Sequence, residues 1–493
     1  MAADPRRFVQ DVGLSFASLA ISSLVHFLLR IFLARYLGPA DLGQYTLAYT
    51  FYSFGVLLSA FGIGGGVGKY VAENKEDALA LPTMRKGRLL LVGVVSSFVI
   101  GCMMWLILHF SSPWIAERFF RIPDLSSLLQ IVAFAFPFIA LEKATLGFLN
   151  GMRRMGLYAF VHVAQNVLIL TLTVALALLG YGLEGAVVAL VLPIVLLGLF
   201  SVVATRRYLN RPSYGESAPI FLTVFRFGIF VVMGNGMYML FYNVDRILLG
   251  RFIDDVAVGI YGIAALLSGL VPLIPSAIQV ITGPTISSYW GRGESGNIQT
   301  LVNRTMKYTA LFILPLSLVG ILLSRDLITL IFGEEYVSAT ASLQILLAGF
   351  IFGGIFTSVG TALSMTSWVH MGFALGAAQV VANVILGIVL IPHFGMSGAS
   401  AATAASLTLG ALLSLYFVQR FIKIAFDWRW FARFLFVSAL VFAGSFALGL
   451  IVNQYLGMVI GLAIMVFIIL RYFVTDEDRE VIRRVVSLRR PAS

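Results

Sequence analysis

The chain has 493 residues, of which 59% are hydrophobic and 12% are charged, and its formal net charge is +11. Soluble domains carry about 25% charged residues, so this composition excludes an ordinary soluble protein. A single cysteine, Cys102, excludes an internal disulfide framework.

Apolar segments follow one another along almost the whole chain. A helix rises about 1.5 Å per residue, so about 20 apolar residues cross a hydrocarbon core of about 30 Å. The predicted spans are 12–36, 41–68, 88–110, 125–148, 156–180, 184–205, 219–243, 256–283, 306–324, 339–363, 370–391, 396–418, 431–452 and 455–474. The predicted fold class is therefore an all-α polytopic membrane protein with about 14 transmembrane helices.

The placement of the basic residues predicts the orientation in the membrane. Arg6 and Arg7 precede the first span, which has no small-residue cleavage site after it and is therefore predicted to be a retained membrane helix. Most other loop cations fall on the same side as these two, whereas the opposite side receives only Arg35, Arg118, Arg121, Arg246, Arg251 and Arg325. The positive-inside rule then predicts a multi-pass protein of the cell membrane with both termini in the cytoplasm. The net charge thus indicates topology and contact with anionic membrane lipids, and no nucleic-acid partner is expected.

An internal repeat indicates duplication. The segments LARYLGPADLGQYTLAY (33–49) and LGRFIDDVAVGIYGIAA (249–265) align at an offset of 216. Their identical positions include Arg35 with Arg251, Gly43 with Gly259, Tyr45 with Tyr261 and Ala48 with Ala264. Because both segments follow spans of the same direction, the repeat is of the parallel kind. It predicts pseudo-symmetric six-helix lobes at 1–211 and 212–424, two further spans within 425–474, and a cytoplasmic tail at 475–493 with a short surface helix.

No pattern of an enzyme is present. The five histidines lack His-x-x-x-His spacing, no Cys-x-x-Cys pair exists, and no phosphate-binding loop of the Gly-x-x-x-x-Gly-Lys type occurs. The Gly-rich stretch GIGGGVGK (62–69) has the wrong spacing for such a loop and is predicted to be a kinked end of a membrane helix. A membrane-embedded glycosyltransferase or polymerase usually has a large polar loop, and the predicted loops are short. We therefore expect no catalytic residue, no metal and no cofactor.

Polar residues inside the spans are the functional candidates. A charge at the centre of a membrane helix costs about 2.5–3.5 kcal/mol, so it normally faces a partner or a wet cavity. The candidates for substrate binding are Arg30, Arg35, Arg246, Arg251, His26 and Arg226. A guanidinium suits an anionic head group because it stays ionised and binds phosphate oxygens in pairs. The candidates for coupling are Asp245, Glu142 and Lys143.

Several of these arginines also have a purely structural interpretation. A cavity position is favoured for Arg30. Arg35 and Arg251 fit equally well as side chains that extend to the outer membrane interface. Asp245 and Arg246 fit better as a structural ion pair.

The remaining polar candidates have structural interpretations too. His26 could titrate during coupling, but a hydrogen-bonded core histidine is the favoured interpretation. The neighbours Glu142 and Lys143 are not expected to share one helix face.

These segments carry a resemblance to a known family. The stretches RIFLARYLGPADLGQYTLAY (30–49), DRILLGRF (245–252), GIYGIA (259–264) and Gly-Met-Arg-Arg at 151–154 resemble polysaccharide-biosynthesis membrane proteins. Those proteins belong to the multidrug/oligosaccharidyl-lipid/polysaccharide exporter superfamily, which includes O-antigen-unit and peptidoglycan-precursor flippases. The resemblance implies two six-helix lobes that open alternately to each side around a cationic central cavity. In the peptidoglycan-precursor branch it also implies a lipid-tail groove, here at 431–474.

The predicted function is thus the flipping of a polyprenyl-diphosphate-linked oligosaccharide for surface polysaccharide or glycan assembly. Glycosyltransferases or a polymerase of the same pathway are candidate partners. The alternative is an ion-coupled multidrug exporter on the same scaffold. That alternative expects acidic cavity residues, whereas the polar span residues here are mainly basic, which favours the flippase. The small number of acidic span residues leaves the coupling ion open.

Overall fold

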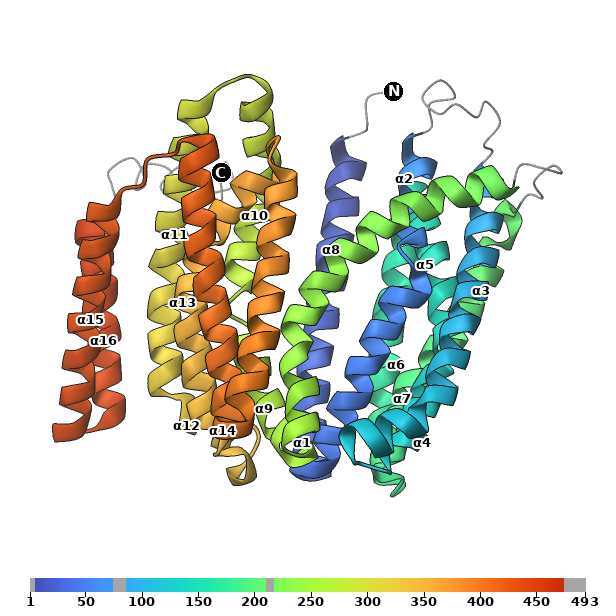
Figure 1. Cartoon of the computed structure of the whole chain (residues 1–493), viewed down its shortest axis with the longest axis horizontal. Helices are drawn as coiled ribbons and strands as arrows, with labels where there is room; N and C mark the ends of the chain where they lie inside the picture. Colours follow the sequence, from blue (N-terminus) through green and yellow to red (C-terminus); the bar gives the residue numbers. More distant parts are fainter. Residues whose placement is uncertain (1–4, 74–85, 210–216, 474–493) are drawn as a thin grey trace, which may run out of the picture. The chain divides into compact units, whose positions relative to one another are not determined.

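The computed structural model describes residues 5–73, 86–209 and 217–473, which are helical and contain no β-strand (Figure 1). The longer helices are α1 (Pro5–Ala60), α2 (Ile63–Glu73), α3 (Lys86–Pro113), α4 (Leu125–Ala133), α5 (Phe136–Gly151), α6 (Met155–Leu178), α7 (Gly182–Thr205), α8 (Ser217–Phe252), α9 (Asp255–Ser268), α10 (Leu273–Gly291), α11 (Ser295–Leu322), α12 (Ser324–Ile331), α13 (Ala339–Ser364), α14 (Val369–Phe417), α15 (Trp428–Ile451) and α16 (Gln454–Ile468). Short 3-10 or π turns are η1 (Trp114–Phe120), η2 (Arg206–Tyr208), η3 (Glu334–Tyr336), η4 (Val418–Ile422) and η5 (Ile469–Phe473). The predicted all-α membrane fold is confirmed, and the predicted tail helix within 475–493 lies outside the described residues.

In the described part, 11 helices are long and apolar enough to cross a membrane, or up to 12 with the bent pair α9–α10 as one span. Two of the 11, Ala20–Ala60 and Val369–Ile422, have 41 and 54 residues, about two to three times the length that one crossing needs. Each contains a glycine outside helical geometry, Gly38 with φ 77° and Gly395 with φ 56°. Such positive φ values suit glycine because it has no Cβ. Both glycines fall between two predicted spans, and the number of fourteen stays a prediction.

The helices form two compact units. The first contains Met1–Gly262, Ile331–Tyr336 and Gly387–Met396, and the second contains Ile263–Leu330, Val337–Leu386 and Ser397–Ser493. The lobes 1–211 and 212–424 were inferred from sequence repetition and stay a prediction.

Helix α2 approaches α5 closely because both carry glycines four residues apart. These glycines are Gly64 and Gly68 on α2 and Gly147 and Gly151 on α5. A Cβ on Gly147 would overlap the carbonyl oxygen of Gly64, and a Cβ on Gly64 would overlap that of Lys143. Small residues at this spacing are a common way for membrane helices to pack. The stretch 62–69 thus contains the start of α2, which follows a break at Phe61 and Gly62, both with positive φ.

The two repeated segments meet at a second glycine contact within the first unit. A Cβ on Gly43 of α1 would overlap the carbonyl oxygen of Asp255, and a Cβ on Gly259 of α9 would overlap that of Pro39. Residues 39 and 255 are themselves equivalent at the offset of 216. A two-fold axis through a contact produces this kind of reciprocity. Both copies therefore use the same surface to reach each other.

In the second unit, α15 and α16 lie side by side (Figure 1) and carry large apolar side chains on exposed faces. Phe436 and Phe467 are 66% and 64% exposed. Such faces suit contact with lipid tails, since the helices satisfy their own backbone groups. At the start of α15, Lys307 of α11 donates a hydrogen bond of 2.8 Å to Asp427.

Candidate functional site

A cavity of about 550 Å³ lies inside the first unit, among α1, α2, α5, α6 and α8. Its polar lining consists of Lys69, Lys143, Asn150, Tyr158, His162 and Asn235. The described lining contains two ammonium groups and no carboxylate. The cavity is therefore suited to an anion.

The glycine contact between α2 and α5 places the two lysines on one cavity. Lys69 follows Gly68 directly, and the backbone of Lys143 is the part of α5 that Gly64 approaches. The Lys69 ammonium lies 3.8 Å from Glu73 and 4.9 Å from the ring centre of Phe227. In the sequence, Lys69 is one of the loop cations on the predicted cytoplasmic side, and no binding role is predicted for it. The paired Gly-x-x-x-Gly spacings in 64–68 and 147–151 could have indicated its place.

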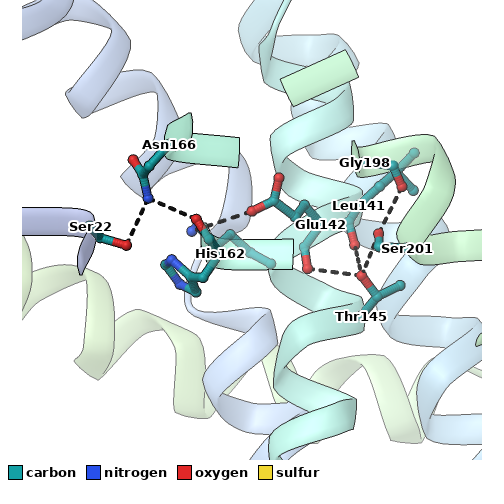
Figure 2. A network of polar contacts seen from close by, with 9 residues as sticks. Ser22, Leu141, Glu142, Thr145, His162, Asn166, Gly198 and Ser201 are labelled. Atoms are coloured by element: carbon teal, nitrogen blue, oxygen red, sulfur yellow. Dashed lines mark hydrogen bonds and ion pairs between the residues drawn. The ribbon is translucent and has the colours of Figure 1, made fainter. Parts of the chain in front are cut away.

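Glu142 and Lys143 are closer than their sequence positions suggest. The Glu142 side chain is fully buried, and Figure 2 shows it extending from α5 toward His162 of α6. The Lys143 side chain is 31% exposed, and its Nζ lies 3.8 Å from Oε1 of Glu142. Being adjacent in the helix, the two residues start from different faces, and their charges meet because the long lysine side chain bends back to its neighbour.

Further hydrogen bonds tie the helices around this pair together (Figure 2). Thr145 donates a hydrogen bond of 2.8 Å to Ser201 of α7. Asn166 of α6 donates hydrogen bonds of 2.9 Å to Ser22 of α1 and of 2.8 Å to the carbonyl of His162. One of these bonds joins α5 to α7 and another joins α6 to α1, close to the side chains that line the cavity.

Arg30 of α1 is half-buried among aromatic rings. Its guanidinium lies 4.8 Å from the ring centre of Tyr49 and 5.4 Å from that of Tyr45. It also donates a hydrogen bond of 3.2 Å to Thr46. Rings and a hydroxyl orient the guanidinium but leave its charge in place. Within the described part of the chain, no carboxylate pairs with Arg30.

Arg246 of α8 is the equivalent of Arg30 at the offset of 216. It donates a hydrogen bond of 2.6 Å to Asn243 and lies within electrostatic range of Asp245 and Arg30. Asp245 is buried and accepts a hydrogen bond of 2.6 Å from Tyr261. Asp245 therefore offsets part of the positive charge of Arg246.

His26 and Arg226 have different environments. His26 is half-buried, contacts the side chain of Asn166 and lies within electrostatic range of Arg30. Arg226 is exposed on α8.

Arg35 and Arg251 make local contacts at the ends of their helical segments. Arg35 is exposed, and its Nε donates a hydrogen bond of 2.8 Å to the carbonyl of Ile331. Arg251 lies 5.8 Å from the ring centre of Phe119 in η1. The structure thus brings His26, Arg30, Asp245 and Arg246 together and gives Arg35 and Arg251 separate partners.

The chemistry available at this site is anion binding. In the part of the chain that the structure describes, no group of three His, Cys, Asp or Glu side chains could hold a metal ion. Lys69 and Lys143 line the cavity, whereas Arg30 and Arg246 lie outside its lining, and all four side chains can donate hydrogen bonds to phosphate oxygens.

Comparison with known proteins decides the family. The family model described as polysaccharide biosynthesis protein matches residues 8–290, more than half of the chain. The chain belongs to the polysaccharide biosynthesis protein family. The resemblance predicted from the sequence is thus confirmed. A second family model, MatE, matches residues 231–389.

Curated relatives of this family member cover most of its length. It is 24% identical over 410 residues to the probable flippase AglR of Haloferax volcanii, with 82% of each chain covered. It is 22% identical to the probable low-salt glycan biosynthesis flippase Agl15 of the same organism, with 84% of each chain covered. It is also 22% identical to the putative O-antigen transporter of Shigella flexneri, over 79% of this chain and 92% of that protein.

Solved structures share the fold of this family member. The lipid II flippase MurJ in an inward closed conformation matches with a TM-score of 0.74 and 17% identity, over 95% of this chain and 100% of that one. An inward-facing multidrug resistance MATE family transporter matches with a TM-score of 0.66 and 16% identity, over 83% of this chain and 98% of that one. The relatives and the fold indicate a multi-pass membrane transporter rather than an enzyme, as predicted.

Proposed function

We propose that this family member is a flippase that moves a polyprenyl-diphosphate-linked oligosaccharide across the cell membrane by alternating access. The observation that carries the proposal is the polar cavity of the first unit, with two lysines and no carboxylate in its described lining. The names of the relatives AglR, Agl15 and the O-antigen transporter support a lipid-linked glycan as the cargo.

The physical reason is solvation. A diphosphate and its sugars lose far more than a few kcal/mol of hydration on entering hydrocarbon. Fixed cations and hydrogen-bond donors in a wet cavity replace that hydration, while the polyprenyl tail stays in the lipid. Net movement further requires the cavity to open alternately to each side and to bind weakly enough to release the cargo.

The charged residues receive graded roles in this proposal. Arg30 binds the diphosphate, because rings and a hydroxyl orient its guanidinium and no described carboxylate neutralises it. Lys69 and Lys143 bind phosphate oxygens from the wall of the cavity. His26 and Arg246 support Arg30 from its immediate surroundings.

The other predicted candidates are proposed to act around this centre. Arg35, Arg226 and Arg251 meet the substrate or anionic lipid headgroups along the route. Asp245 holds Arg246 in place and takes part in coupling only through it.

The membrane orientation and the partners belong to the same proposal. Both termini lie in the cytoplasm, in agreement with the positive-inside rule. Helices α15 and α16 form a groove for the polyprenyl tail, which their exposed apolar faces support. Glycosyltransferases or a polymerase of the same pathway supply or consume the cargo.

A multidrug exporter is the second candidate, favoured by the MatE model match and by the structural likeness to a MATE family transporter. Each cavity lysine lies 3.8 Å from a carboxylate outside the lining, so the net positive charge of the cavity is small. The lining itself offers ammonium groups and no carboxylate to pair with a cationic drug, which supports the flippase better.

The decisive experiment uses the full-length protein in sealed lipid vesicles. A fluorescent polyprenyl-diphosphate oligosaccharide in the inner leaflet is expected to reach the outer leaflet and to be modified there by an added glycosidase. A cationic dye in the same vesicles is expected to stay where it is. Movement of the dye without movement of the lipid-linked sugar would replace the flippase with the exporter.

A further inference from the structure

Anion binding alone does not explain why the acidic side chain of Glu142 is buried next to the cavity. Its side chain is fully buried in α5, and neither carboxyl oxygen has a hydrogen-bond partner in the described part of the chain. Its nearest charge is the ammonium of Lys143 at 3.8 Å. A buried carboxylate without hydrogen bonds is costly unless a cation lies next to it or a proton binds to it.

The surroundings of Glu142 leave Lys143 as its main counter-charge. The titratable groups within electrostatic range of the carboxyl group are Lys143 on its own helix, Tyr52 on α1 and Tyr158 on α6. His162 of α6 and Lys69 of α2 line the cavity beside it. The single hydroxyl of the neighbouring Thr145 lies within hydrogen-bond distance of Ser201 and of two backbone carbonyls, so it is directed away from the Glu142 carboxyl group. Loss of the lysine would therefore leave an uncompensated buried charge.

Lys143 faces two competing anions. Its side chain is 31% exposed and lines the cavity, while its ammonium also reaches back to Glu142. A phosphate group in the cavity has more charge and more acceptor oxygens than a single carboxylate, and it binds an ammonium strongly. When the ammonium turns to the phosphate, the remaining carboxylate is stabilised by taking a proton from water.

We propose that Glu142 couples anion binding to proton uptake, with Lys143 shared between the carboxylate and the phosphate. The inference rests on the proposed function, because it requires an anion in this cavity. On binding, one proton forms an O–H bond with a carboxyl oxygen of Glu142. On release, the lysine returns to Glu142 and the proton leaves to water. Anion affinity therefore increases as the pH falls, and a proton gradient biases the direction of release.

Calorimetry of the full-length protein in detergent tests this directly, with inorganic pyrophosphate as the probe. Titrations at one pH, in buffers that differ in ionisation enthalpy, give the number of protons taken up per bound pyrophosphate. Pyrophosphate also exchanges protons in this range, so the uptake assigned to Glu142 is the difference between the unaltered protein and Glu142→Gln. We expect this difference to be roughly 0.5–1 proton at some pH between about 5 and 9. Glu142→Gln is expected to bind at least as tightly as the unaltered protein and to lose this uptake, because its side chain is always neutral.

Two matched variants separate coupling from general charge effects. Lys69→Met removes a cavity cation that pairs with the exposed Glu73, so it should weaken binding several-fold and keep the uptake per bound anion. Glu73→Gln removes that exposed carboxylate, so it should raise the affinity only slightly and keep the uptake per bound anion. Lys143→Met should lose both the tight binding and the uptake.

The outcomes distinguish the inference from the proposed function. Equal proton uptake by Glu142→Gln and by the unaltered protein at every pH tested would overturn the coupling role and leave the anion cavity intact. Absence of pyrophosphate binding would contradict the anion cavity, and the coupling role with it. If Glu142→Gln does not fold, the uptake of the unaltered protein and of Lys143→Met still decides between these outcomes.

Discussion

Arg30 and Arg246 lie just before the two repeated segments, at equivalent positions of the two copies, and have different electrostatic surroundings. In the first copy, Arg30 lies on the rings of Tyr45 and Tyr49 without a described carboxylate partner. In the second copy, Arg246 is bonded to Asn243 and follows Asp245. The position equivalent to Asp245 in the first copy is the apolar Leu29. One substitution between the copies therefore separates a cation without a described carboxylate beside it from one whose charge is offset in part by a neighbouring carboxylate.

The largest expected effect comes from Arg30. Arg30→Ala should lower the rate of lipid-linked sugar movement in vesicles by at least about tenfold, because a hydrogen bond to a charged group contributes about 1.5–3 kcal/mol. Arg30→Lys should give an intermediate rate, since the charge remains and the paired geometry is lost. Protein levels in the membrane should stay normal in both variants. A normal rate in Arg30→Ala would reject the distinction between the copies.

Arg246, whose charge is partly offset, should matter more for stability than for transport. Arg246→Ala leaves Asp245 without its neighbouring positive charge, so the free energy of unfolding in detergent should fall by about 1–3 kcal/mol. The double variant Asp245→Asn with Arg246→Ala should recover part of this loss. If Arg246→Ala is as stable as the unaltered protein and as inactive as Arg30→Ala, the two arginines act alike.

The contact between the copies offers a test of their symmetry. Gly43→Ala and Gly259→Ala each place a Cβ against a backbone carbonyl, so each should lower the free energy of unfolding by about 1–3 kcal/mol. Together they should cost less than the sum, because the first Cβ already separates the two helices. Gly156→Ala is the matched control, since nothing lies within 4 Å of its Cβ. Strictly additive losses would show that the two glycines do not share one contact.

The smallest expected effect comes from an exposed ion pair outside both copies. The hydrogen bond from Lys307, together with one from the backbone of Trp430, holds the pKa of Asp427 below its usual range. This stabilisation is present above the ordinary aspartate pKa of about 3.9 and is lost as the pH falls through the lowered folded value. Because the Asp427 side chain is 45% exposed, Lys307→Met should cost only about 0.2–1 kcal/mol at neutral pH. Thermal unfolding measured at neutral and acidic pH checks both the size and the sign.

Local patterns explain most of what the sequence predicted about the fold. Apolar length alone indicates membrane helices, and the breaks at Gly38 and Gly395 fall where the predicted spans end. The identity of Arg35 with Arg251 and of Gly43 with Gly259 indicated the repeat before any contact was known. Such features depend only on residues that are close together along the chain, so they can be predicted from the sequence.

The site was less predictable because it depends on side chains from separate helices. The pairing of Glu142 with Lys143 follows from how far a lysine side chain bends, which spacing along a helix does not specify. The shared cavity of Lys69 and Lys143 follows from a helix contact between segments about 75 residues apart.

By itself, the sequence determined an all-helical membrane protein of the polysaccharide biosynthesis family, with a repeated segment and a basic set of span residues. Only the tertiary structure decided which cations lie together, which acid is buried beside them and which arginine has its charge offset. The reason is that hydrophobic length and periodicity are properties of one segment, whereas the electrostatic surroundings of a buried charge are set by every helix packed against it.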